Sequence, residues 1–136
     1  MSKEKVPVAL IQQAVDTAAA FLPRLIDALI RVAENLLHEE QFQEGLALFS
    51  ASQDGIKWFC QMVALRSVWL EAGSQGVLLN EEWPSFIQTM AAAADALAAQ
   101  DYVLLSDLLL YEVVPFMEEV LAIVQGLEKE PVGHAV

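Results

Sequence analysis

Residues 11–36 read IQQAVDTAAAFLPRLIDALIRVAENL, and this stretch decides the fold. Its apolar residues recur at intervals of three or four, the spacing that keeps side chains on one face of an α-helix. The series runs without a slip through Ile11, Val15, Ala18, Leu22, Leu25, Leu29, Ala33 and Leu36. Charged residues fall on another face, where Asp27 and Arg31 form an i,i+4 pair. The stretch therefore predicts a long helix that packs one face into a core.

Pro23 lies in the middle of this helix. A proline inside a helix removes one backbone hydrogen bond and bends the axis. Because the apolar spacing keeps its phase on both sides of Pro23, we predict one kinked helix. A break at residues 21–22 is the alternative.

A second helix is predicted to start at Phe42. Its apolar stripe consists of Phe42, Leu46, Phe49, Ile56, Cys60, Val63 and Leu70. Gly45 and Gly55 weaken this assignment, because glycine costs about 1 kcal/mol relative to alanine inside a helix. We predict one long helix, with a turn at residues 54–55 as the alternative.

The clearest break in the chain is the segment AGSQG at residues 72–76. Asn80 then has the character of an N-cap, and a third helix is predicted from there to about Ala99. Its expected inward residues are Phe86, Met90, Ala94 and Leu97. Asp101 is the expected N-cap of a fourth helix, which Pro115 interrupts. Its apolar series is Tyr102, Leu105, Leu109, Val113, Phe116, Val120, Ile123 and Leu127.

These four segments predict an all-α fold, an antiparallel four-helix bundle with proline-kinked first and last helices. The chain has 136 residues, the size of one domain. We assign residues 1–128 to a single bundle and expect residues 129–136 to form a disordered tail.

The composition excludes several classes of partner. The net charge is −12, with 7 Lys and Arg in all, so nucleic acid is a poor partner. Charged residues interrupt every long apolar stretch, which argues against membrane insertion. The polar first residues and the single cysteine, Cys60, favour a cytoplasmic protein.

Catalytic and metal chemistry find little support. Glu34 and His38 are four residues apart, whereas di-iron bundles use Glu-x-x-His pairs with a spacing of three. Cys60 lies on the apolar stripe of the second helix, where it is expected to act as a small hydrophobe. We therefore predict no catalytic residue, no metal and no cofactor.

Glu112 lies three residues after Leu109 and four before Phe116, at the edge of an inward-facing stripe. A buried charge needs a partner, so an ion pair with Arg24, Arg31, Lys57 or Arg66 is the structural interpretation. A polar site formed by Glu112 and Tyr111 is the functional alternative. Pro115 has no backbone N–H and so leaves the Tyr111 carbonyl without its usual donor, which a side chain or water can replace.

The second helix carries another apolar stripe, which is the stronger lead. Trp58, Met62, Leu65 and Trp69 are spaced four, three and four. Trp and Met are enriched at interfaces and on adaptable binding surfaces. We predict either that both stripes serve one core or that this one binds a partner, with Trp83 as a further member.

Three segments carry a family resemblance. They are DYVLLSDLLLYEVVPF at residues 101–116, FQEGL at 42–46 and DGIKW at 54–58. Together they resemble a signature of small uncharacterised all-helical proteins of Gram-positive bacteria, in which an Asp-led helix carries a Tyr-Glu-x-x-Pro step. Such proteins are similar in architecture to flagellar secretion chaperones. That likeness implies binding of a helical export substrate and no catalytic residue.

Two functions follow as predictions. The first is a non-enzymatic, chaperone-like interaction module that dimerises or binds the helix of a protein partner through the Trp58 stripe. The second is a bundle that binds a small molecule, or an enzyme, with a polar site near Glu112 and Tyr111.

Overall fold

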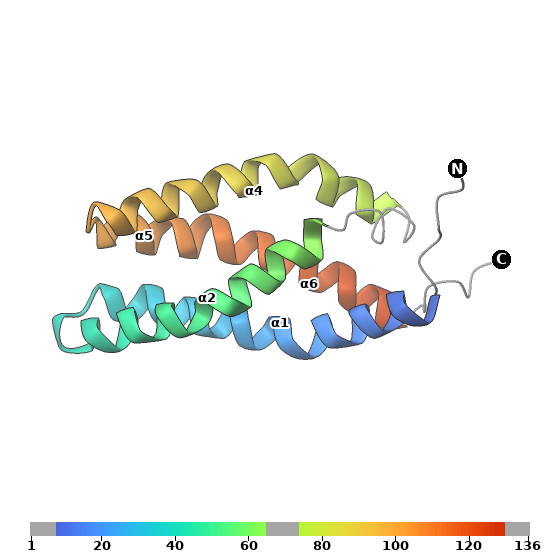
Figure 1. The fold of residues 1–136 in the computed structure, drawn as a ribbon, viewed down its shortest axis with the longest axis horizontal. Coiled ribbons are helices and arrows are strands. Elements are labelled where there is room, and N and C mark those ends of the chain that lie inside the picture. The colour runs from blue at the N-terminus through green and yellow to red at the C-terminus, as the bar shows by residue number, and fades with distance from the viewer. Residues whose placement is uncertain (1–7, 65–73, 130–136) are drawn as a thin grey trace.

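The computed structural model describes residues 8–64 and 74–129, and these are almost entirely helical. α1 (Val8–Leu36) leads through a short 3-10 turn (η1, Glu39–Gln41) into α2 (Phe42–Ala64). After α4 (Ser74–Ala98), the chain forms a single long rod from α5 (Tyr102–Leu108), a π-helical turn (η2, Leu109–Val113) and α6 (Val114–Lys129) (Figure 1). No strand occurs in the described part of the chain. The prediction of an all-α four-helix bundle is confirmed.

The four rods do not pack symmetrically. α1 packs along both α2 and α6, and α4 packs along the rod of α5, η2 and α6. α2 starts beside the C-terminal end of α1 and then crosses the bundle diagonally toward α4 (Figure 1). The C-terminal half of α2 therefore diverges from the N-terminal half of α1.

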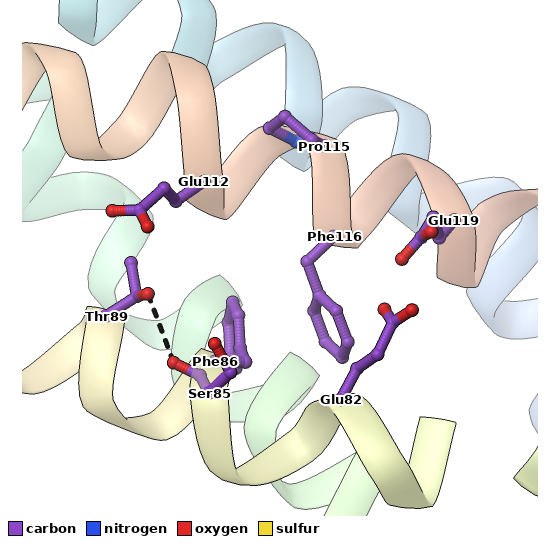
Figure 2. Close-up of a pocket in the computed structure, with 8 residues that line it drawn as sticks. All are labelled: Glu82, Ser85, Phe86, Thr89, Glu112, Pro115, Phe116 and Glu119. Atoms are coloured by element: carbon purple, nitrogen blue, oxygen red, sulfur yellow. Dashed lines mark hydrogen bonds between the residues drawn. The ribbon is translucent and has the colours of Figure 1, made fainter. Parts of the chain in front are cut away.

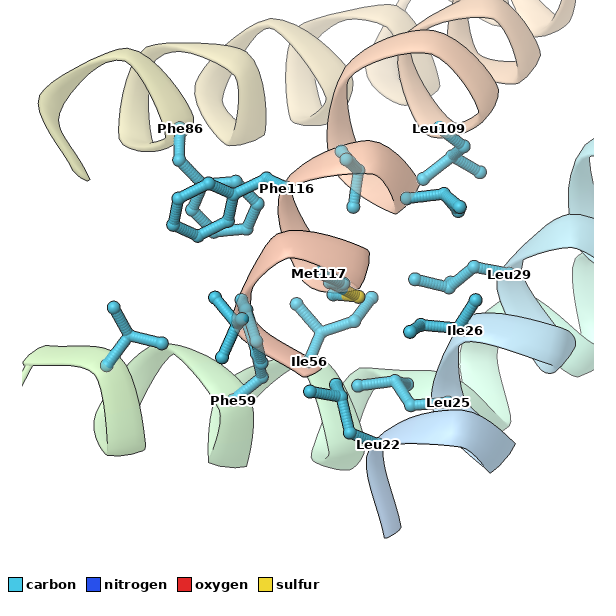
Figure 3. Close-up of a cluster of buried hydrophobic side chains, with 14 of the residues drawn as sticks. Leu22, Leu25, Ile26, Leu29, Ile56, Phe59, Phe86, Leu109, Phe116 and Met117 are labelled. Atoms are coloured by element: carbon cyan, nitrogen blue, oxygen red, sulfur yellow. The ribbon is translucent and has the colours of Figure 1, made fainter. Parts of the chain in front are cut away.

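The core follows the predicted stripes of the first and last helices. In α1, the described stripe residues are buried from Val15 to Leu36, and in the last rod the buried series runs from Leu105 to Ile123. Met117 lies at the centre of this core, surrounded by side chains from α1, α2 and α4 (Figure 3). These are the helices in which apolar and charged positions contrast most clearly.

The inward stripe of α2 differs from the predicted one. Its buried members are Gly45, Phe49, Ser52, Ile56, Phe59 and Val63, spaced by four and three, with Met62 beside them. Cys60, Leu46 and Phe42 are only half-buried. Phe49, Ile56 and Val63 are buried as predicted, whereas Gly45, Ser52 and Phe59 were missed. Gly45 and Ser52 have no apolar side chain, so spacing of apolar residues does not reveal these inward positions. The turn considered at residues 54–55 does not form.

The third helix also differs from prediction in its start and its face. It begins at Ser74, so Asn80 lies inside the helix rather than at its N-cap. The buried positions are Phe86, Thr89, Ala93 and Ala96, whereas Ala94 and Leu97 are exposed. The alanine run 91–94 has no polar contrast, so the sequence does not reveal which side faces inward. The Thr89 hydroxyl is satisfied by the carbonyl of Ser85 at 3.1 Å.

The two prolines that were predicted to disturb their helices lie in different surroundings. α1 runs through Pro23 without the break considered at residues 21–22. In the last rod, the Val114 amide donates to the Leu109 carbonyl five residues earlier, which makes the wide turn η2 just before Pro115. A proline ring clashes with the carbonyl four residues back, and a π turn relieves such crowding.

Two specific hydrogen bonds fix the end of the bundle where α1 ends and α5 begins. The Asp101 carboxylate accepts from the Leu104 amide at 3.1 Å, which confirms the predicted N-cap of the last rod. At the C-terminal end of α1, the Leu37 amide donates to Glu34, so the Ala33 carbonyl lacks that usual donor. The buried hydroxyl of Ser106 donates to this Ala33 carbonyl at 3.1 Å and ties α5 to α1.

Ser106→Ala is expected to lower the free energy of unfolding by about 1–2 kcal/mol, because it leaves the Ala33 carbonyl buried without a donor. Urea unfolding followed by circular dichroism measures the change. The exposed Ser85 on α4 provides the control, and its replacement by alanine is expected to have little effect. Equal losses in both variants would show that the Ser106 bond adds nothing.

Candidate functional site

A groove opens where α2 diverges from α1. The two helices touch at Gly55, where an added Cβ would lie 3.0 Å from Leu25 Cδ1 and 3.2 Å from Phe21 Cζ. Toward the N-terminal end of α1 they enclose a groove of about 390 Å³. It is lined by Leu10, Gln13, Ala14 and Thr17 of α1 and by Trp58, Gln61 and Met62 of α2. None of these residues is charged, so the groove is suited to an apolar side chain.

Aromatic and aliphatic side chains at this groove remain accessible to solvent. The Trp58 ring is half-buried and packs edge-on against Phe21, with ring centroids 4.9 Å apart. Leu10 is 55% exposed and Phe21 36%.

Two of the four residues of the predicted Trp58 stripe, Trp58 and Met62, therefore line this groove. Trp58 forms one wall of the groove and Met62, only 8% exposed, forms its floor. Leu65 and Trp69 lie outside the described residues. Trp83 does not line this groove; it stacks on Phe86 in α4, with centroids 5.7 Å apart.

The α1 wall was missed by the sequence reasoning. Leu10, Ala14, Thr17 and Phe21 follow the same four, three, four spacing as the Trp58 stripe. This second series in α1 was therefore a usable signal. It is faint, because Ala14 and Thr17 are only weakly apolar.

A second cavity, of about 300 Å³, lies between α4 and the last rod. Its base is the stacked pair Phe86 and Phe116, with ring centroids 4.4 Å apart. Its polar lining consists of Glu82, Ser85, Thr89, Glu112 and Glu119 (Figure 2). Within residues 8–64 and 74–129 these carboxylates have no ion pair, since the ion pair found there is Arg31–Asp27 on α1.

Glu112 and Tyr111 lie differently from the prediction. Glu112 is exposed at the edge of the cavity and does not pair with Arg24, Arg31 or Lys57; Arg66 lies outside the described residues. Tyr111 is 73% exposed and does not line the cavity, so the polar group beside Glu112 comes from α4 and α6 instead. Glu112 needs no buried partner because it is solvated. A small-molecule site here stays a prediction.

The carboxyls of Glu82 and Glu119 face each other across this cavity (Figure 2). The main cause that raises the pKa of Glu82, to about 6, is a hydrogen bond that its protonated carboxyl donates to the Glu119 side chain. Partial burial and repulsion from Glu119 contribute further. On α2, burial raises the pKa of the Cys60 thiol, which lowers its reactivity.

The described residues show neither a metal-ligand cluster nor a membrane-spanning helix. No group of three or more His, Cys, Asp or Glu side chains is arranged to hold a metal ion. None of the helices there combines the length and apolarity that crossing a bilayer demands.

Fold and groove together define a class: an asymmetric four-helix bundle whose first two helices diverge around an open apolar groove. The chain belongs to the family described as Domain of unknown function (DUF8042), whose model matches residues 13–123. The match extends from α1 into α6 and so covers both sides of the groove. Comparison with curated proteins and with solved structures gave no match.

Proposed function

We propose that this protein is a non-enzymatic interaction module that binds the apolar face of a partner's amphipathic helix in the α1–α2 groove. The observation that carries the proposal is the uncharged groove with Trp58 on its wall and Leu10 exposed at its edge. Helix-in-groove recognition uses such surfaces, and apolar residues at i, i+3 and i+4 of the partner would fill it. The half-buried Trp58 ring and the partly exposed Phe21 ring beside it would add an aromatic surface for such a helix to cover.

The charge of the chain indicates the kind of helix. With a net charge of −12, the protein attracts partners that carry Lys and Arg beside their apolar face. The groove itself is uncharged, so these basic residues would lie at its flanks rather than inside it. A cytoplasmic chaperone that holds a helical export substrate, as the resemblance implies, is one form of this function.

A synthetic peptide of leucine and lysine, about five helical turns long, tests the proposal. One version places every leucine on one helical face, and a scrambled version of equal charge does not. We expect the first to bind and the second to bind at least tenfold more weakly by calorimetry. Equal affinities would mean that charge alone drives binding, which would contradict a groove.

Trp58→Ala is expected to weaken binding of the amphipathic peptide by about 2 kcal/mol, a roughly 30-fold rise in Kd. Val103 on α5, 62% exposed and away from the groove residues, gives the control variant Val103→Ala. If both variants bind equally well, the groove is not the binding surface. Light scattering measures the molar mass in solution and so tests whether a second copy of the chain fills the groove. A wild-type dimer that Trp58→Ala converts to a monomer would show that it does.

A further inference from the structure

The α4–α6 contact contains two acids, Glu82 and Glu119, whose carboxyl groups face each other with no cation paired to either among the described residues. Glu82 extends from α4 and Glu119 from α6, and their carboxyl groups meet at one side of the 300 Å³ cavity (Figure 2). Glu82 is half-buried. Two ionised carboxylates in such a position repel each other, whereas a pair that shares one proton forms a strong hydrogen bond.

We propose that Glu82 and Glu119 form a proton-dependent latch, in which one shared proton holds α4 against α6 and its loss loosens the contact. The proton comes from and returns to solvent, because Glu119 is exposed. The latch lies beside the stack of Trp83 and Phe86 on α4 and of Phe116 on α6. Loosening it exposes the aromatic base of the cavity.

No cation among the described residues lines the cavity to neutralise Glu82 and Glu119 in place of a proton. Glu112 lines the same cavity and adds a negative charge from the last rod. Glu81 on α4 and Glu118 on α6 are exposed neighbours that line neither side. The described charged residues of α1 and α2 do not line the cavity either; they are Asp16, Arg24, Asp27, Arg31, Glu34, Glu44, Asp54 and Lys57. Within the described residues, a proton is therefore what neutralises the pair.

The direction of the pH effect follows from linkage. The pKa of Glu82 rises from an ordinary 4.5 to about 6 in the folded protein, so the folded state holds the proton more tightly than the unfolded chain does. The stabilisation is then complete below 4.5 and is lost as the pH rises through about 6. The fully ionised pair should be found at neutral pH and the latched pair in mildly acidic solution.

Urea unfolding of the full chain at pH 5.5 and 7.5 tests the latch. We expect the wild-type midpoint to fall at pH 7.5. Glu82→Gln, whose amide donates to Glu119 at either pH, is expected to lose much of that difference and to be more stable than wild type at pH 7.5. Glu81→Gln and Glu118→Gln remove the same charge from the same helices and are expected to keep the wild-type difference.

A general repulsion among the acids would give all three variants the same pH dependence, and that result would overturn the latch. Carbon-detected NMR titration of Glu82 provides a second measurement that does not depend on stability. A midpoint near 6 that shifts the Trp83 indole resonance supports the latch. A midpoint at the ordinary value near 4.5, or an unchanged Trp83 resonance, rejects it.

Discussion

Phe59→Ala is expected to lower the free energy of unfolding by about 3–5 kcal/mol, because Phe59 is the largest fully buried side chain among the described residues. Phe59 is fully buried and extends from α2 into the core (Figure 3). Its ring packs edge-on against Phe86 of α4, with centroids 5.6 Å apart, and against Phe116 of α6 at 6.0 Å. Removing the ring leaves a cavity where three helices meet, and edge-to-face ring contacts are lost in addition.

Urea or guanidinium unfolding followed by circular dichroism measures this loss. Phe59→Leu is the matched variant, because it keeps much of the volume, and it should cost clearly less than Phe59→Ala. Val103→Ala on the exposed side of α5 should stay within about 0.5 kcal/mol of wild type. If Phe59→Ala behaved like Val103→Ala, α2 would not pack on α4 and α6 as described.

Phe59 also shows where sequence periodicity stops being informative. In α1 and the last rod, large apolar residues fill nearly every inward position, so spacing alone identifies the buried face. In α2 the inward series passes through Gly45 and Ser52, which hydropathy does not register as core. The spacing of apolar residues therefore predicts Cys60, rather than Phe59, as the inward-facing residue of α2. A small residue is needed where two helices approach closely. Which positions of α2 need one depends on where α1 packs against it, and the sequence of α2 alone does not contain this information.

The candidate sites also combine features that the sequence predicts with features that depend on how the helices pack. Trp58 and Met62 were predictable, because their spacing puts them on one helical face. The groove was not, since it exists only because α2 diverges from α1 beyond Gly55. The facing of Glu82 and Glu119 depends on the register between α4 and α6, which neither helix encodes alone. Glu112 lines a cavity, but it is exposed and none of the described cations pairs with it, contrary to the ion pair expected from the sequence.

Gly45→Val is expected to destabilise the protein by about 3 kcal/mol, at the upper end of the cost of overpacking. A Cβ at position 45 would lie 3.0 Å from Asn35 Cβ and 3.2 Å from the backbone nitrogen of Leu36. Those neighbours belong to the last turn of α1 and move only if the helix moves. The two branches of valine would enlarge the clash, and its slightly better helix propensity than that of glycine offsets only part of the cost.

Gly126→Ala on α6 is the matched control, because an added Cβ there would meet no atom within 4 Å. That variant should gain about 1 kcal/mol from helix propensity alone. Opposite signs for the two variants in urea unfolding would show that Gly45 is retained for close approach of α2 to α1. A gain in both would mean that the helices are farther apart there. The contacts at Gly45 and Gly55 determine where α2 can separate from α1, and so Gly45→Val should also weaken peptide binding in the groove.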